Sequence, residues 1–142
     1  MKGWWPAALM ATACQGVVTV VQPVEVSGVV ETLDDEPGAL HIEAYQAWAG
    51  KGDLRYPLRR VGQMWQDAPG AYALSVELPA EDGEGLVMYA WQDRDGDGQH
   101  CAPGTDDEPA GLVVVSEGAV EDEVTADLLL DTDCIGPTRL FP

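Results

Sequence analysis

Three aspartates at alternate positions lie in a short loop with glycines between them. The segment runs Asp93-Arg94-Asp95-Gly96-Asp97-Gly98-Gln99. Carboxylates spaced in this way can turn inward around one cation, and Ca²⁺ suits them because it takes about six to eight oxygen ligands in a flexible shell. The loop therefore predicts a calcium site, with ligands from Asp93, Asp95 and Asp97 and from the backbone carbonyl of Gln99.

The pattern matches only the first half of an EF-hand loop. Gly98 stands where that loop makes its sharp turn, but Gly104 occupies the place of the bidentate Glu, and no flanking helices are predicted. A complete EF-hand is therefore excluded. We expect the remaining ligand from the acidic stretch that follows, which contains Asp106, Asp107 and Glu108. The alternative is a solvated acidic turn without an ion, and Arg94 is expected to point into solvent.

The cysteines Cys14, Cys101 and Cys134 give an odd count, which needs an explanation in an exported protein. If Cys14 carries a lipid, the other two form an even pair. We then expect a Cys101–Cys134 disulfide, which an oxidising compartment permits. The alternative is two free buried thiols. Zinc is not favoured, because His100 beside Cys101 lacks the further nitrogen and sulfur ligands that a zinc site needs.

Residues 1–13 have the composition of an export signal. One lysine precedes a short apolar stretch, small residues follow, and the whole is too short for a membrane-spanning helix. Ala11-Thr12-Ala13-Cys14 resembles the lipobox of bacterial lipoproteins, although such motifs usually carry Leu where Ala11 stands. We therefore divide the chain into a signal peptide (1–13), a lipidated tether or first strand (14–23) and one domain (24–142).

A lipid on Cys14 would anchor the protein to a membrane of the bacterial cell envelope, because acyl chains insert whatever the charge of the protein. Gln15 follows the cysteine. In the Gram-negative lipoproteins that this start resembles, an Asp at that position holds the protein at the inner membrane, so its absence makes the outer membrane the expected location. The alternative is ordinary cleavage after Ala13, which would leave a soluble exported protein.

The body of the chain alternates as half-buried strands do. Tyr72, Leu74, Val76 and Leu78 share one face of the clearest run, and residues 40–45 alternate in the same way, although 39–49 could also form a helical turn. Residues 86–92 are apolar enough for a strand at the centre of a sandwich. Further strands are expected at 24–31, 54–65, 111–117 and 123–130. Pro57 marks the strand at 54–65 as an edge or irregular strand.

These elements predict an all-β fold. No long segment has helical periodicity with caps, and turn residues recur between the strands. The strand spacing indicates a single antiparallel β-sandwich of about seven strands, with the acidic loop between two of them.

The order of features from Val24 to Asp131 resembles that of transthyretin-like or carboxypeptidase-regulatory-like domains in exported bacterial proteins. The matching segments are Val26-Ser27-Gly28-Val29-Val30, Pro69-Gly70-Ala71-Tyr72-Ala73-Leu74, Val87-Met88-Tyr89-Ala90-Trp91 leading into Asp93-Arg94-Asp95-Gly96-Asp97-Gly98, and Glu108-Pro109-Ala110-Gly111. The resemblance implies a prealbumin-like sandwich with a binding or scaffolding role, usually non-catalytic. It implies no catalytic residue, and its calcium ligands correspond here only to Asp93, Asp95 and Asp97.

Charge and motifs narrow the function. The chain has 25 Asp and Glu against 7 Lys and Arg, a formal net charge of -18. Nucleic acid is therefore excluded as a partner, because its binding depends on Lys and Arg. We expect no enzyme, since the chain lacks the nucleophile and metalloprotease motifs G-x-S-x-G and H-E-x-x-H.

The expected function is a calcium-stabilised, non-catalytic binding or structural module. Its protein or glycan partner is not specified by the sequence. The alternative is a carbohydrate-binding module, because exposed aromatic faces with carboxylates nearby suit sugars, and Trp48 and Trp65 could supply such faces. Either tryptophan could instead pack in the core, where aromatic side chains contribute large buried areas.

Overall fold

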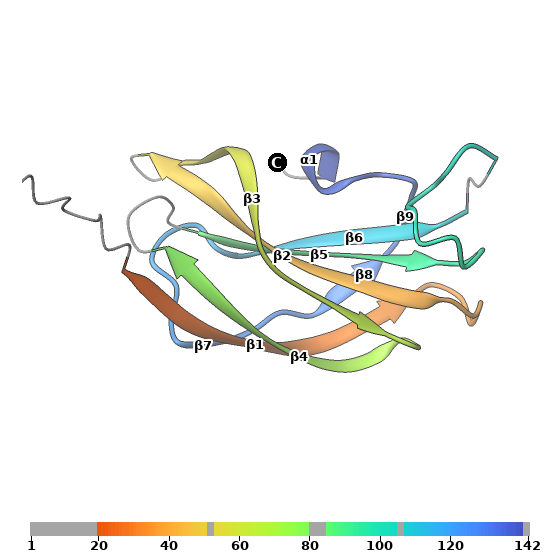
Figure 1. The fold of residues 1–142 in the computed structure, drawn as a ribbon, viewed down its shortest axis with the longest axis horizontal. Coiled ribbons are helices and arrows are strands. Elements are labelled where there is room, and N and C mark those ends of the chain that lie inside the picture. The colour runs from red at the N-terminus through yellow and green to blue at the C-terminus, as the bar shows by residue number, and fades with distance from the viewer. Residues whose placement is uncertain (1–19, 51–52, 80–84, 105–106, 141–142) are drawn as a thin grey trace, which may run out of the picture.

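The computed structural model describes residues 20–50, 53–79, 85–104 and 107–140, with backbone alone for 48–50 and 53–57. The elements are β1 (Val21–Thr32), β2 (Ala39–Gly50), β3 (Asp53–Gln66), β4 (Gly70–Pro79), β5 (Leu86–Asp93), β6 (Pro109–Ser116), β7 (Glu123–Thr125), β8 (Leu128–Leu130), β9 (Thr132–Asp133) and α1 (Pro137–Leu140). The strands form two facing sheets (Figure 1). One has the order β4-β1-β7 with β8 also paired to β1, and the other has the order β3-β2-β5-β6-β9.

The predicted all-β sandwich is confirmed, with two differences. The described residues contain nine strands, where about seven were expected, and β1 pairs in parallel with both β7 and β8. The strand predicted at 123–130 is divided at Ala126 and Asp127. The Ala126 carbonyl accepts a hydrogen bond from the Tyr72 hydroxyl at 2.7 Å, and the Asp127 carboxylate accepts one from the Val29 N–H at 2.9 Å. The backbone also stays bonded to β1 at the break, because the Ala126 N–H donates to the Ser27 carbonyl at 2.8 Å.

The other strand predictions agree with the structure. Residues 39–50 form a strand and not a helix, and β3 lies at the edge of its sheet, as Pro57 indicated. The β2–β3 pairing contains two irregularities, between Ala44 and Tyr45 and between Ala47 and Trp48. β1 begins at Val21, so it includes the last residues of the segment expected to be tether or first strand.

The core lies between the two sheets and comes from alternate residues of the long strands. Val24 and Val26 of β1 face Leu40 and Ile42 of β2, and all four side chains are buried. β4 contributes the predicted face, on which Tyr72, Val76 and Leu78 are buried and Leu74 is partly buried. This alternation is the period of two that a strand imposes when one face is covered.

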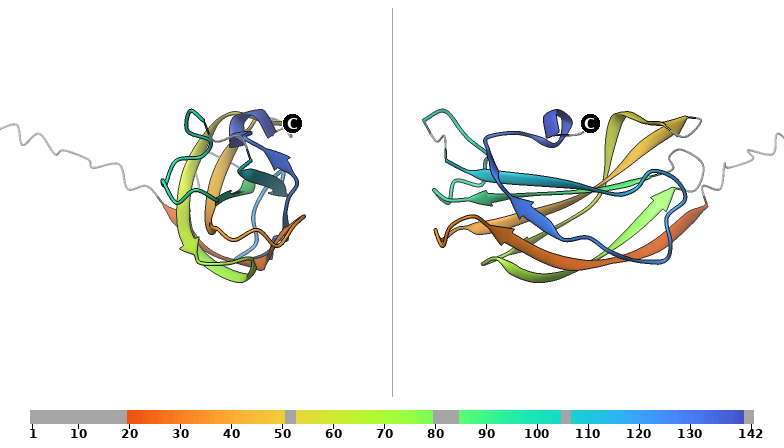
Figure 2. Two further views of the ribbon diagram at one scale, coloured as in Figure 1. Left: turned by 90° about the vertical axis from the view of Figure 1, so that its right-hand side faces the viewer. Right: turned by 180° about the vertical axis from the view of Figure 1, so that it is seen from behind.

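β5 is buried on both faces, which explains its continuous apolar composition. Met88 and Ala90 point into the sandwich core. Tyr89 and Trp91 point to the other face of the same sheet, where Leu140 of α1 packs against them. Figures 1 and 2 show α1 on this outer side, away from β1 and β4. Trp91 is therefore buried, but in a second apolar cluster outside the sandwich core.

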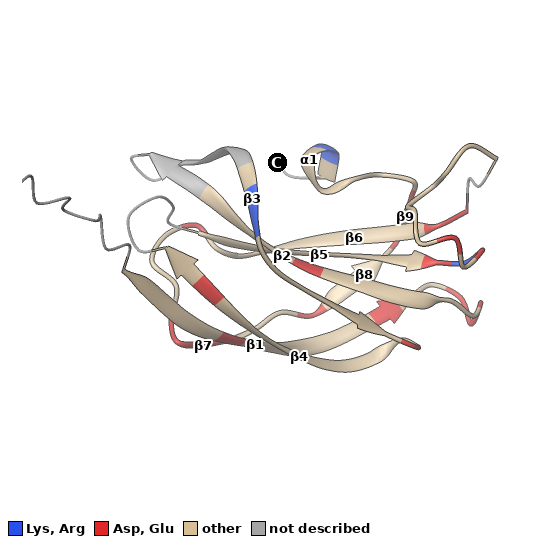
Figure 3. Cartoon of the chain, in the orientation of Figure 1, with Lys and Arg blue, Asp and Glu red and all other residues tan. Residues whose placement is uncertain are grey.

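Three connections gather at one end of the sandwich. The long strands run up and down, so the β1–β2, β3–β4 and β5–β6 connections must share an end (Figure 1). Acidic residues concentrate there, as Figure 3 shows. β1 begins at the opposite end. The topology therefore collects the carboxylates of separate loops in one region.

Candidate metal centre

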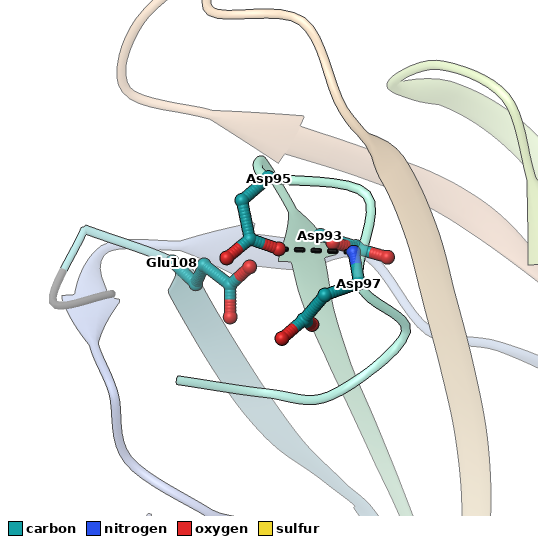
Figure 4. A group of neighbouring side chains, drawn as sticks. All are labelled: Asp93, Asp95, Asp97 and Glu108. Carbon is teal, nitrogen blue, oxygen red and sulfur yellow. Dashed lines mark hydrogen bonds between the residues drawn. The ribbon is translucent and has the colours of Figure 1, made fainter. Parts of the chain in front are cut away.

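Four carboxylates converge where β5 ends and β6 begins. Asp93 is the last residue of β5, Asp95 and Asp97 follow in the connection, and Glu108 directly precedes β6. Each offers an oxygen atom, and these four oxygens lie within 4.8 Å of one another (Figure 4). Asp93 and Glu108 are buried, whereas Asp95 and Asp97 are exposed. The pairing of β5 with β6 brings Glu108 beside the loop despite the separation in sequence.

The loop itself is shaped by hydrogen bonds from its backbone to its carboxylates. Asp93 accepts from the N–H groups of Gly96 at 2.8 Å and Gly98 at 2.9 Å. Asp95 accepts from the Asp97 N–H at 3.0 Å, the dashed contact in Figure 4. Both glycines have φ of +75°, a conformation that other residues adopt with difficulty. The glycines thus allow the chain to curl around Asp93.

Glu108 is held from several directions. Its carboxylate accepts hydrogen bonds from the N–H groups of Arg94, at 3.2 Å, and Cys101. Its backbone carbonyl accepts the Cys134 N–H at 3.0 Å and lies 3.1 Å from His100 Nε2. The predicted disulfide joins Cys101 to Cys134, with Cα atoms 5.4 Å apart. Both half-cystines therefore contact the same glutamate.

Asp93 and Glu108 place two carboxylates in the buried part of this site. In the part of the chain that the structure describes, no Lys or Arg side chain pairs with Asp93 or Glu108. Carboxylates so close together repel each other, and a bound cation would compensate that repulsion. The donors are all carboxylate oxygens, with no histidine or cysteine among them. Such a set fits a hard cation such as Ca²⁺ and does not resemble a zinc site.

The structure distinguishes among the predicted ligands. It brings Asp93, Asp95 and Asp97 together, and it adds Glu108 from the three residues considered for the remaining position. Asp107 is exposed and is not one of the four. Asp106 lies outside the described residues. Gln99 is exposed, and its backbone N–H donates to the Asp97 carboxylate at 2.7 Å.

The expectation for Arg94 was wrong. Its side chain is only 14% exposed, and its guanidinium contacts Asp34 in the β1–β2 connection at 2.7 Å. Its Nε donates to the Gln92 side chain at 3.1 Å. The guanidinium lowers the pKa of Asp34 through this hydrogen bond. Sixty positions separate the two residues, so no local pattern could reveal that Arg94 ties two acidic loops together.

The same end of the sandwich carries an open groove of about 700 Å³. It lies between the β1–β2 connection and the β3–β4 turn, and Asp34 and Asp67 are among its lining residues. The Arg94–Asp34 ion pair therefore connects the carboxylate loop to one wall of this groove.

A histidine and two tryptophans form a row on the outer face of the second sheet. His41 stacks on Trp91 with ring centroids 3.9 Å apart and planes inclined by 15°, and Trp65 meets His41 edge-on. Trp65 is 56% exposed. The side chain of Trp48 lies outside the described residues. Of the two tryptophans considered as ligand-binding, Trp65 is thus the one shown to present a surface.

Comparison of the chain with models of protein families, with curated proteins and with solved structures finds no match. Among the described residues, no helix has the length and apolar character needed to cross a membrane.

Proposed function

We propose that the protein is a bacterial lipoprotein, anchored to the membrane at Cys14, whose calcium-stabilised sandwich acts as a non-catalytic binding or structural module. The convergence of Asp93, Asp95, Asp97 and Glu108 within 4.8 Å carries the calcium part of the proposal. A cation there would compensate the charge of the two buried carboxylates. It would also fasten the β5–β6 connection to the start of β6, since its ligands come from both.

Calcium titration tests the metal site directly. Calcium is added to the metal-free oxidised domain, and binding heat and melting temperature are measured. A ligand that binds only the folded state stabilises it by about 2.7 kcal/mol at a hundredfold excess over Kd. Because the net charge is -18, MgCl₂ at equal concentration controls for general screening. We expect calcium to stabilise more than magnesium, which demands a more rigid octahedral site.

Two neighbouring acidic residues provide a matched pair of variants. Glu108→Gln removes the charge of a buried member of the cluster and is expected to weaken calcium binding about tenfold or more, because ligand charge tunes affinity. Asp107→Asn removes a charge one residue away, outside the cluster, and should leave the affinity nearly unchanged. Equal losses in both variants would show diffuse charge attraction and contradict a defined site.

The anchor and the location rest on the N-terminal sequence, which lies outside the described residues. The lipobox-like Ala11-Thr12-Ala13-Cys14 supports acylation at Cys14, and Gln15 supports the outer membrane. Intact mass spectrometry of membrane-extracted protein tests both cleavage and acylation. A mature mass with the acyl chains on Cys14 supports the anchor. An unmodified chain beginning at Cys14 would instead indicate a soluble exported protein.

A carbohydrate-binding module is the second candidate, and the exposed ring of Trp65 favours it. Sugars stack their C–H faces on such rings, and this ring extends a row that includes His41 and Trp91. Glycan-array binding that is lost in Trp65→Ala would support this function. Leu129→Ala is the control, since Leu129 is also exposed, at 47%, but belongs to β8 of the other sheet. Absence of glycan binding would count against the candidate.

A further inference from the structure

The disulfide and the carboxylate cluster share one residue. Glu108 accepts a hydrogen bond from the Cys101 N–H at its carboxylate and another from the Cys134 N–H at its carbonyl. Cys101 stands in the β5–β6 connection, and Cys134 stands directly after β9. The cross-link therefore joins two segments that are 33 positions apart in sequence, and both of them are hydrogen-bonded to Glu108.

The disulfide links the β5–β6 connection to the residue that follows β9. β9 pairs with β6 through only two residues, Thr132 and Asp133. Both cysteines have positive φ, 51° for Cys101 and 55° for Cys134, so each lies in a conformation that non-glycine residues seldom adopt. The cross-link therefore joins two positions whose backbone has this seldom adopted conformation and whose N–H groups both donate to Glu108.

We propose, on the basis of the calcium site proposed above, that the Cys101–Cys134 disulfide positions Glu108 as a metal ligand, so that reducing the disulfide weakens calcium binding. Glu108 is fully buried, its carboxylate accepts the N–H groups of Arg94 and Cys101, and its carbonyl accepts that of Cys134. The two aspartates on the exposed side, Asp95 and Asp97, come from the loop itself and do not need the cross-link. Reduction would leave a weaker, aspartate-only site.

The redox step balances with a dithiol as reductant. The S–S bond breaks, each cysteine sulfur takes up one electron and one proton, and the dithiol is oxidised to its own disulfide. Linkage makes the effect reciprocal, because the factor by which reduction weakens calcium binding must equal the factor by which saturating calcium opposes reduction. A tenfold factor corresponds to about 30 mV in the midpoint potential of a two-electron couple.

Calcium binding to the mature chain is measured by calorimetry in the oxidised form, in the dithiothreitol-reduced form, and in Cys101→Ser/Cys134→Ser. We expect the affinity to fall about tenfold or more in the last two. Dithiothreitol should have no effect on the double variant. Val76→Ala, a core truncation in β4, should lower stability while leaving the affinity unchanged. This control separates loss of positioning from general destabilisation.

Glu108→Gln identifies the residue through which the disulfide acts. In its background, reduction should cause little further loss, because the two changes remove the same ligand. Where the double cysteine variant does not fold, the reduction equilibrium of the wild-type chain is measured with and without saturating calcium, and calcium should shift it toward the disulfide.

The outcomes separate this inference from the metal site itself. If the oxidised wild-type chain binds no calcium, the proposed function fails and the inference fails with it. If the oxidised chain binds calcium and the reduced chain binds it equally well, the calcium site stands and the role of the disulfide is overturned. An effect of reduction that is undiminished in Glu108→Gln would also overturn it.

Discussion

His41 is the buried polar residue whose environment is most unusual. It is 6% exposed and lies between the rings of Trp91 and Trp65, and its Nε2 atom has no hydrogen-bond partner among the described residues. Burial lowers its pKa to about 4, against a smaller opposing effect from Asp93. The His41 ring is therefore neutral in the folded protein at neutral pH, and it packs as an uncharged aromatic ring against Trp91.

The low pKa of His41 predicts an acid-dependent loss of stability. The unfolded chain protonates this histidine near pH 6.5, whereas the folded chain does so only near pH 4. Between these values unfolding takes up a proton, so the free energy of unfolding falls as the pH falls, by at most about 1.4 kcal/mol per pH unit for one proton. His41→Phe keeps an aromatic ring and removes the titration.

Urea unfolding at pH 7.0, 6.0 and 5.0, without added calcium, measures this difference. The many carboxylates contribute equally to both proteins, so the gap between the two stability curves isolates His41. Stability of His41→Phe should decline less than that of the wild type over this range. Parallel curves would show that the histidine does not titrate in this window.

At the scale of elements, β8 belongs to the sheet of β1 and packs closely against the facing sheet. It pairs with β1 and also contacts β6. Two glycines allow β8 and the break before it to come close to their neighbours. A Cβ on Gly28 of β1 would lie 1.9 Å from the Ala126 carbonyl oxygen, and one on Gly111 of β6 would lie 2.0 Å from that of Leu129. Both obstacles are backbone atoms, which cannot move aside as a flexible side chain can.

Gly28→Ala and Gly111→Ala should therefore each lower the free energy of unfolding, by about 1–3 kcal/mol, the usual cost of overpacking a close contact. Gly118→Ala is the matched control, because a Cβ there meets nothing within 4 Å. Its effect should stay within about 0.5 kcal/mol. Denaturant unfolding of the three variants measures these differences in the free energy of unfolding. A neutral result for Gly28→Ala would mean that the chain at Ala126 can shift away from β1 at little cost.

For the whole molecule, the local sequence pattern was sufficient to predict a strand wherever the core alone decides which of its residues are buried. The alternation of Tyr72, Val76 and Leu78 predicted the buried face of β4, and the apolar run at 86–92 predicted a strand at the centre of the sandwich, where β5 lies. The short elements β9 and α1 escaped prediction because two and four residues are too few to show a period. Parallel pairing of β1 with β7 and β8 depends on distant contacts, which no window of sequence contains.

The same distinction between local pattern and distant contacts applies to the residues of the candidate site. Asp93, Asp95 and Asp97 could be found from spacing, because all three belong to one turn. Glu108 could only be narrowed to a group of three neighbouring acids, since its selection depends on the β5–β6 register and on burial. Arg94 was misjudged because its partner, Asp34, comes from another loop.

The start of β1 and the acidic loops lie at opposite ends of the sandwich. This arrangement bears on where the loops would lie in a molecule that is tethered through its N-terminal segment. β1 has 12 residues, and at about 3.3 Å per residue it spans roughly 40 Å. With the proposed anchor at Cys14, the carboxylate cluster would stand at the end remote from the bilayer. That separation is several times the screening length of about 8–10 Å in physiological salt. Cation occupancy of the loop would then follow the free concentration in the surrounding medium, and not the enriched layer at the lipid surface.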